Sequence, residues 1–228
     1  MLGFGGRLVM LASRLLHPEA VGKLTEGGNR IGEFSVDGTI ALVLFGGLGS
    51  GLLAAVVWVF LRQWMPDSSV LVGLGAVAIG GFALVEADNP DFVVLVDPQI
   101  DLVLLLGLTF LFGMTLLWLD RLLDRRLPAG GGNVSKVVYT LIAGVGAPFL
   151  IPTFGTFFSQ EFCSCESPPI WTGVFLLGAA VATVTWWVLN LRRAASPPTV
   201  LQRLGSISAT GAVLAGGVHL TGQIVAIL

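Results

Sequence analysis

The sequence contains few charged residues for its length. Lys, Arg, Asp and Glu make up 11% of the 228 residues, whereas soluble globular domains carry roughly 25%. Hydrophobic residues account for 54% and the mean hydropathy is +0.88, so a water-soluble fold could not cover its apolar surface. The net charge of -2 also lacks the basic excess of a nucleic-acid-binding domain. These shortages exclude a soluble globular protein and a nucleic-acid partner, and they favour the lipid bilayer as the surroundings of the chain.

The few charges are unevenly distributed and leave long stretches with none. A transmembrane helix needs about 20 mainly apolar residues. Strict alternation of apolar and polar residues is absent, so we interpret the apolar runs as helices and not as strands of a barrel. The sequence therefore predicts an all-α, polytopic transmembrane helical bundle with about six spans and no soluble catalytic domain. The runs are 38–61, 68–85, 102–119, 137–158, 168–191 and 204–228, of which the second is the shortest.

Residues of the N-cap type precede several of these runs, and three of them are followed by proline. Asp or Ser can accept an orphan N–H at a helix start, and Pro fits the first helical position because its missing N–H is not needed there. We therefore expect caps at Asp37, Asp97, Ser167 and Ser196.

Lys and Arg are missing from two of the predicted loops, 86–101 and 159–167. Basic residues concentrate in short cytoplasmic loops, and eight of the 12 in this chain follow the first, third and fifth runs. The alternation predicts a multi-pass protein of the bacterial cytoplasmic membrane, with the acidic 86–101 loop and the Cys-Ser-Cys loop outside. The eight residues are Arg62, Arg121, Arg125, Arg126, Lys136, Arg192, Arg193 and Arg203.

The N-terminal segment 1–37 lacks an uninterrupted apolar run, because Arg7 and Arg14 divide it. We treat it as a unit separate from the six-span domain 38–228, consisting of an apolar segment and an outer linker. Two interpretations remain open. The segment is an interfacial amphipathic helix, or it is the outer half of a transmembrane helix whose beginning is encoded upstream of Met1.

Three stretches carry a resemblance to known proteins: VDGTIALVLFGGLGSGL, ADNPDFVVL and LWLDRLLDRRLP. They resemble an uncharacterised family of bacterial, actinobacterial-type polytopic integral membrane proteins, over roughly residues 11–128. The resemblance implies a full apolar helix before the segment that matches 25–37. It implies no catalytic or binding residues and no cofactor.

The first run contains a glycine cluster, GGLGSGL. Gly47 and Gly51 have the GxxxG spacing that allows another helix to approach closely, which predicts a homo-oligomer or a membrane-protein partner through Gly-rich helix faces. An alternative is an intramembrane hydrolase with Ser50 as nucleophile and His219 as base. Rhomboid-type proteases use such a dyad, but their GxSG motif requires glycine where this chain has Leu48, and no oxyanion-hole donor is identifiable.

Five residues are candidates for a functional role. His219 is the ionisable side chain placed well inside a predicted span, where such groups are often functional, although a neutral His bonded to a carbonyl or hydroxyl is simpler. Pro148 and Pro152 interrupt the fourth run, as in transporters with broken helices, although most such prolines only kink a helix. Cys163 and Cys165 are expected to form a disulfide or to pair between subunits, with metal binding as the alternative.

The 86–101 tract carries five acids and no base. A Ca²⁺ site needs six to eight converging oxygens, and the tract does not contain a loop sequence of that type. We expect the acids to act as a topological and capping feature, with Asp101 favouring the positive end of a helix. The competing interpretation is an acidic mouth that attracts cations to a pore. The acids are Glu86, Asp88, Asp91, Asp97 and Asp101.

The sequence thus predicts a non-enzymatic integral membrane protein, with a scaffold or accessory subunit as the leading role. A small transporter or channel that uses the broken fourth helix and His219 is second, and an intramembrane hydrolase is third. We assign no catalytic residue, metal site or cofactor.

Overall fold

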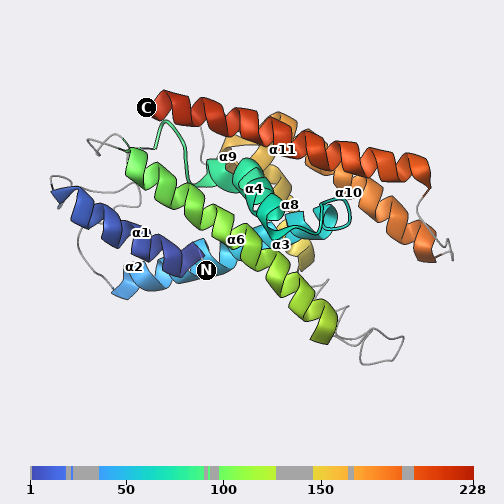
Figure 1. The fold of residues 1–228 in the computed structure, drawn as a ribbon, viewed down its shortest axis with the longest axis horizontal. Coiled ribbons are helices and arrows are strands. Elements are labelled where there is room, and N and C mark those ends of the chain that lie inside the picture. Colours follow the sequence, from blue (N-terminus) through green and yellow to red (C-terminus); the bar gives the residue numbers. More distant parts are fainter. Residues whose placement is uncertain are drawn as a thin grey trace.

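The computed structural model describes residues 2–18, 22, 36–89, 92, 98–126, 146–163, 167–191 and 198–228. Every regular element in these ranges is a helix, which confirms the all-α prediction. The elements are arranged as an elongated bundle (Figure 1). In chain order they are α1 (Leu2–Leu16), α2 (Val36–Ala41), η2 (Leu42–Gly49), α3 (Ser50–Leu61), α4 (Ser69–Gly80), η3 (Gly81–Ala83), α6 (Gln99–Arg126), η4 (Ala147–Phe149), α8 (Leu150–Phe158), α9 (Gln160–Cys163), α10 (Ile170–Leu191) and α11 (Thr199–Ile227).

Four helices in the described ranges are long and apolar enough to cross a membrane, which is compatible with a multi-pass membrane protein. The second and fourth predicted runs contain shorter helices, Ser69–Ala83 and Ala147–Phe158. At 1.5 Å per residue the first of these is about 22 Å long, less than the roughly 30 Å hydrocarbon core. The count of six spans is therefore approximate. The four long helices are Gly38–Leu61, Gln99–Arg126, Ile170–Leu189 and Thr199–Ile227.

The helix starts differ from the predicted caps. The backbone N–H groups of Leu102, Gly173 and Gln202 donate to the carbonyl oxygens of Pro98, Pro169 and Pro198. An N-cap residue is defined by accepting this first bond, so proline occupies the cap position in all three helices. Pro198 has a φ of -54° and the extended ψ of 142° that is typical of a cap, a combination that the fixed φ of proline allows. The expected side-chain cap at Ser167 is therefore wrong, and the predicted caps at Asp97 and Ser196 lie outside the described residues.

The first span begins at Val36, so Asp37 lies in its first turn and not at the predicted cap. The middle of this span, η2, is a π-helix of 8 residues. Such segments are rare and contain one more residue per hydrogen-bonded turn than an α-helix. The span is therefore continuous from α2 through α3, but its two halves do not share one helical register.

Helix α4 lies between α6 and α11, and small residues let it approach both. A Cβ at Gly113 of α6 would lie 2.5 Å from Ala76 Cβ, and a Cβ at Gly216 of α11 would lie 2.3 Å from the Ala78 carbonyl oxygen. As α4 proceeds along the chain, its contacts move toward the start of α6 and toward the end of α11. Helix α4 is therefore antiparallel to α6 and parallel to α11. Helix α10 packs antiparallel on α11, where Gly178 meets Ser208 and Gly211 meets Phe175. Helices α6 and α10 therefore run in the same direction, opposite to that of α4 and α11.

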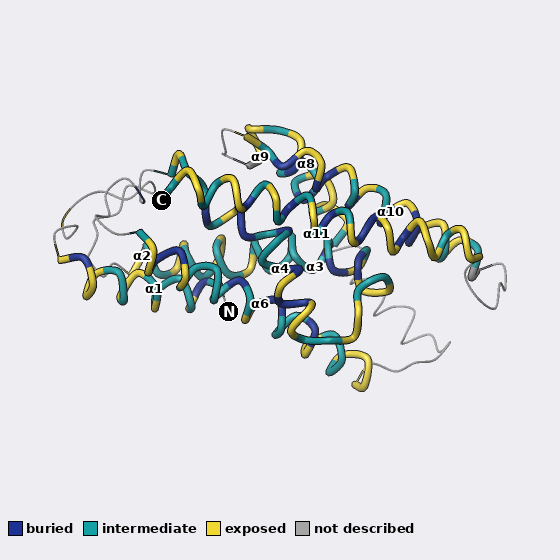
Figure 2. Tube along the Cα trace, turned by 45° about the horizontal axis from the view of Figure 1, so that its top comes forward, coloured by how far each residue is buried: buried dark blue, intermediate teal, exposed yellow. Residues whose placement is uncertain are grey.

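The largest buried cluster of the described residues lies between α4, α10 and α11, with single residues from α3, η3 and α8. Figure 2 shows buried stretches on the sides that face other helices and exposed stretches along the outside. The exposed side chains include many large apolar ones, which is the surface that a bilayer accommodates. The cluster contains Leu61, Ile79, Phe82, Phe157, Leu176, Ala179, Ala209 and Ala212.

The N-terminal helix α1 runs antiparallel beside the first half of α6 (Figure 1). A Cβ at Gly5 would meet the side chain of Leu108, and Ser13 bonds to Asp101, closer to the start of α6. At its own start α1 also touches η2, where a Cβ at Gly3 would lie 2.9 Å from the Leu42 carbonyl oxygen. The helix is thus held by both the first span and α6.

Candidate functional site

Polar side chains gather at the two opposite ends of the bundle. One group surrounds Asp101 in the first turn of α6, and we call this the Asp101 end. The other surrounds Arg62, just after α3, and we call this the Arg62 end. Arg62 pairs with Asp120 and Asp124 near the end of α6, so most of the length of this helix separates the two groups.

At the Asp101 end, a carboxylate is buried between two helices. Asp101 is 3% exposed. Its Oδ1 accepts a hydrogen bond from Ser13 Oγ, and its Oδ2 lies 2.9 Å from His17 Nε2. Ser13 and His17 are four residues apart, so they project from the same side of the α1 segment. This group joins α1 to α6 by two polar contacts on one carboxylate.

Ser13, His17 and Asp101 are the residue types of a hydrolase triad, but their order is different. In a triad the imidazole lies between the hydroxyl and the carboxylate, so that it can take the proton of the nucleophile. Here the carboxylate lies between the hydroxyl and the imidazole. Ser13 Oγ donates a hydrogen bond to Asp101 and is not activated by His17. The arrangement serves to connect helices.

The role of Asp101 goes beyond the one predicted for it. The carboxylate does lie in the first turn of α6, where it favours the helix dipole, but it also anchors α1. The sequence analysis did not single out Ser13 or His17. Their i, i+4 spacing in an apolar segment was the available signal. Asp91 and Asp97 lie outside the described residues.

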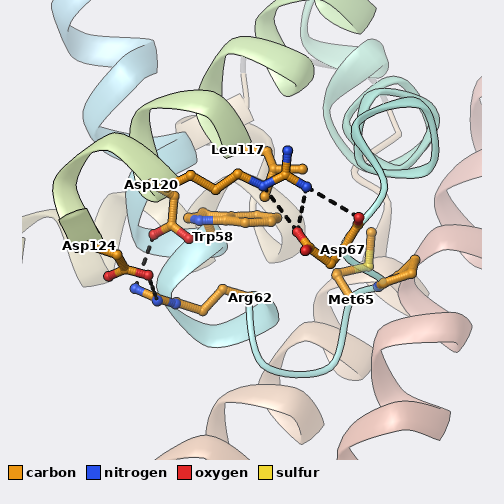
Figure 3. A pocket seen from close by; sticks show the side chains of 9 residues that line it. Trp58, Arg62, Met65, Asp67, Leu117, Asp120 and Asp124 are labelled. Carbon is orange, nitrogen blue, oxygen red and sulfur yellow. Dashed lines mark hydrogen bonds and ion pairs between the residues drawn. The ribbon is translucent and has the colours of Figure 1, made fainter.

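At the Arg62 end, two arginines hold three helices together (Figure 3). Arg62 Nη1 lies 3.0 Å from Asp120 Oδ1, and its Nη2 lies 2.8 Å from Asp124 Oδ2. Arg121 donates from Nε and Nη2 to Asp67 Oδ1, at 3.1 and 2.5 Å, and from Nη2 to the Asp67 carbonyl oxygen at 3.2 Å. The end of α3 and the segment before α4 are thereby both fastened to α6.

These ion pairs surround a pocket of about 300 Å³. Trp58, Met65 and Leu117 supply its apolar lining, and the indole of Trp58 lies among the charged side chains in Figure 3. Trp58 is 8% exposed. Its Nε1–H is buried and has no hydrogen-bond partner among the residues that the structure describes. A buried N–H without an acceptor is unusual in a folded protein.

Another polar group at this end is fully satisfied. Thr183 Oγ1 of α10 accepts bonds from Gln63 Nε2 at 2.8 Å and Trp64 Nε1 at 2.9 Å. The same hydroxyl donates to the Phe60 carbonyl oxygen at 2.8 Å. One threonine therefore connects α10 to the end of α3 and to the turn that follows it.

The predicted hydrolase pair is not brought together by any contact in the described part of the chain. Ser50 Oγ donates to the Gly46 carbonyl oxygen at 2.5 Å within its own span. His219 lies on α11 with its ring edge toward Phe82, at a centroid distance of 6.1 Å and an interplanar angle of 79°. Phe82 also contacts Phe157 of α8 at 5.6 Å. His219 thus belongs to an aromatic group that reaches the end of the proline-interrupted run.

The two prolines of the fourth run lie at the break itself. Pro148 is exposed in η4, and Pro152 lies in the first turn of α8. Thr153 Oγ1 donates to the Phe149 carbonyl oxygen at 2.5 Å, and Thr156 Oγ1 to the Thr153 carbonyl oxygen at 2.7 Å. Hydroxyl groups of this kind commonly satisfy carbonyls near a proline in membrane helices. Cys165 and the side chain of Cys163 lie outside the described residues.

The two glycines of the GxxxG spacing face different surroundings. A Cβ at Gly47 would lie 3.6 Å from the backbone of Gly3, so this position accommodates α1 of the same chain. A Cβ at Gly51 would have nothing within 4 Å. Gly47 lies in the π-helix and Gly51 in α3, and the change of register explains why i, i+4 residues do not share a face here.

Comparison with protein-family models, with curated proteins and with solved structures gives no match for this chain. The resemblance to bacterial polytopic membrane proteins therefore stays a prediction from its three stretches of sequence.

Proposed function

We propose that this chain is a non-enzymatic membrane scaffold or accessory subunit, which holds a second membrane helix against its first span. The observation that carries the proposal is the small amount of burial on that span. No residue is buried in the most apolar 18-residue stretch of Gly38–Leu61, whereas 39% of the corresponding stretch of Ile170–Leu189 is buried. The first span therefore has the most surface to offer to another helix.

The outward face of this span has the chemistry of a helix-packing surface. Phe45 and Leu48 are 78% and 61% exposed. Gly51 lies one turn beyond Leu48 and has open space around it. Large apolar side chains beside a small residue allow two helices to approach closely in a bilayer, where packing and not water drives association.

The use of the polar side chains supports a structural role. Asp101, Arg62 and Thr183 each bond to a neighbouring helix of the same chain. A transport path requires polar groups that are available to a substrate near the middle of the membrane. The three groups named here lie at the ends of the bundle and serve to join helices.

A photo-crosslinking amino acid at Leu48 tests the proposal in native membranes. We expect one discrete crosslinked product, either a homodimer or an adduct of defined mass, which Gly51→Leu abolishes by filling the open position. Leu111 of α6, which is 49% exposed, provides the matched control on another span. The same product from Leu111, or no discrete product from Leu48, contradicts the proposal.

For the orientation, we propose that the Arg62 end faces the cytoplasm of a bacterial cell and the Asp101 end faces outside. Arg62 and Arg121 lie at one end, with Arg125 and Arg126 in the last turn of α6. Their concentration at one end supports this orientation, because basic residues favour the cytoplasmic side.

A small transporter or channel is the second candidate function. The observation that favours it is the aromatic group of His219, Phe82 and Phe157, which joins an ionisable side chain to the broken fourth run. Flux of a small solute into proteoliposomes above that of protein-free vesicles, lost in His219→Phe, would favour this function over a scaffold. Equal flux in both vesicle preparations would exclude it for the solutes used.

A further inference from the structure

The pocket at the Arg62 end has unused hydrogen-bonding capacity of both kinds. Each of its three carboxylates gives one side-chain oxygen to an arginine: Asp67 Oδ1, Asp120 Oδ1 and Asp124 Oδ2. No bond to the second oxygen of any of the three is described within these residue ranges. Three carboxylates and two guanidinium groups leave the lining with a net charge of -1. The pocket therefore offers acceptors to a cationic group.

The unused donor of the pocket is the indole of Trp58. This side chain is more than nine-tenths buried and lines the pocket, yet its Nε1–H lacks an acceptor in the described part of the chain. The other indole at this end, that of Trp64, bonds to Thr183. A ligand with an acceptor oxygen would give the Trp58 indole N–H a hydrogen-bond partner, as Thr183 does for Trp64.

The pocket lies where lipid headgroups are found. Helix α6 has 28 residues and is about 42 Å long, which exceeds the roughly 30 Å hydrocarbon core. Its Asp120–Arg126 end therefore lies beyond the apolar region. Close to the pocket, Val59, Trp118 and Leu119 are exposed on the two helices that form it, and they provide an apolar surface along which acyl chains can lie.

We propose that this pocket binds the headgroup of a zwitterionic aminophospholipid. The primary ammonium donates to the second oxygens of Asp67, Asp120 and Asp124, and a phosphate oxygen accepts from Trp58 Nε1–H beside the two arginines. An anion alone would meet a lining of net negative charge, and a cation alone would leave the indole N–H without an acceptor. A headgroup with both charges satisfies both, and the neighbouring apolar surface favours a lipid over a soluble ligand.

Native mass spectrometry of the purified full chain in mild detergent tests the proposal. The probes are phosphatidylethanolamine, phosphatidylcholine, which has the phosphate but no N–H donors, and phosphatidylglycerol, which has no ammonium. We expect about tenfold greater retention of phosphatidylethanolamine than of the other two, the effect of losing hydrogen bonds to a charged group. Equal retention of the three lipids overturns the proposal.

Two variants assign the binding to this pocket. Trp58→Phe keeps the aromatic ring and removes the N–H, and Asp124→Asn removes one carboxylate whose side chain is 60% exposed. We expect each to lower the retention of phosphatidylethanolamine, whereas Trp171→Phe on α10, which lies outside both the lining and the apolar surface beside it, leaves it unchanged. Thermal unfolding without added lipid identifies a variant that fails to fold, and the other variant then decides. Wild-type retention in a folded Trp58→Phe or Asp124→Asn protein overturns the assignment.

Soluble phosphoethanolamine distinguishes a lipid from a free small molecule. If phosphatidylethanolamine is retained and soluble phosphoethanolamine at millimolar concentration does not displace it, the lipid source is supported. Complete displacement by the soluble compound contradicts a lipid as the occupant.

Discussion

The contact between α1 and α6 leads to a quantitative prediction. The side chains of His17 and Asp101 are 6% and 4% exposed. His17→Ala removes one of two polar contacts of the buried Asp101 carboxylate, and the loss of a hydrogen bond to a charged group costs about 1.5–3 kcal/mol. The bond from Ser13 to Asp101 remains in this variant, so we expect about 2 kcal/mol for His17→Ala.

The exposed pair at the other end provides the comparison. Arg121 and Asp67 have side chains that are 42% and 84% exposed. An exposed pair contributes about 0.2–1 kcal/mol, so Arg121→Ala should destabilise the protein several times less than His17→Ala. The free energy of unfolding of both variants can be measured by reversible unfolding of the full chain in mixed micelles with increasing dodecyl sulfate.

A double-mutant cycle separates the pair from its surroundings. The combined His17→Ala and Asp101→Ala protein loses the contact between these two side chains once, whereas each single variant loses it separately, so its destabilisation should fall below the sum of the single variants by about 1 kcal/mol. Additive single effects, or a His17→Ala cost no larger than that of Arg121→Ala, would show that the pair does not hold α1 on α6.

Three further predictions concern orientation and packing. In intact cells, after reduction, Cys163 should react with a membrane-impermeant thiol reagent while a cysteine introduced at Gly131 should not, since Gly131 lies between the arginines at the end of α6 and Lys136; labelling of the Gly131 position alone would reverse the orientation. Gly216→Val should destabilise the bundle by about 1–3 kcal/mol in the micelle assay, because a Cβ would lie 2.3 Å from the Ala78 carbonyl oxygen and overpacking has this cost. Gly222→Ala, with open space around it, is the control, and an equal loss in both would contradict the packing. Thr183→Val should cost about 1–3 kcal/mol, because it leaves the Gln63 and Trp64 donors without their acceptor, whereas Thr221→Val, which loses only a bond to Gly217 in its own helix, should cost less.

The sequence was sufficient for the helical class because the bilayer allows few alternatives. A charge-free run of about 20 residues has to satisfy its backbone internally, and the runs 38–61, 102–119, 168–191 and 204–228 all form long helices. The helix expected over the 68–85 run is shorter than predicted, because the last residues of this run lie beyond η3 in a turn. Apolar composition does not distinguish a turn inside the bundle from a helix.

The contacts that connect the helices could not be derived from local patterns. The bond from Ser13 to Asp101 and the pair of Arg62 with Asp124 depend on which helices become neighbours, and a single sequence does not specify the neighbours. The proline caps were mispredicted for a local reason. Asp-Pro and Ser-Pro dipeptides suggest a polar cap followed by proline, but in these helices the proline carbonyl itself accepts the first helical bond.

The π-helix of the first span determines the angle between the surfaces that its two halves present. Each residue of an α-helix rotates the side-chain direction by about 100°. The additional residue per turn in the π-helix therefore rotates the side chains of α3 about the helix axis relative to those of α2. In η2, Gly47 lies toward Gly3 of α1. In α3, Phe60 lies toward Trp187 of α10, with ring centroids 6.3 Å apart. A single-residue deletion within Leu42–Gly49 would remove this rotation and leave every side chain chemically intact. The span could then dock on α1 or on α10, but not on both at once, so the chain length of this segment acts as a specificity element in its own right.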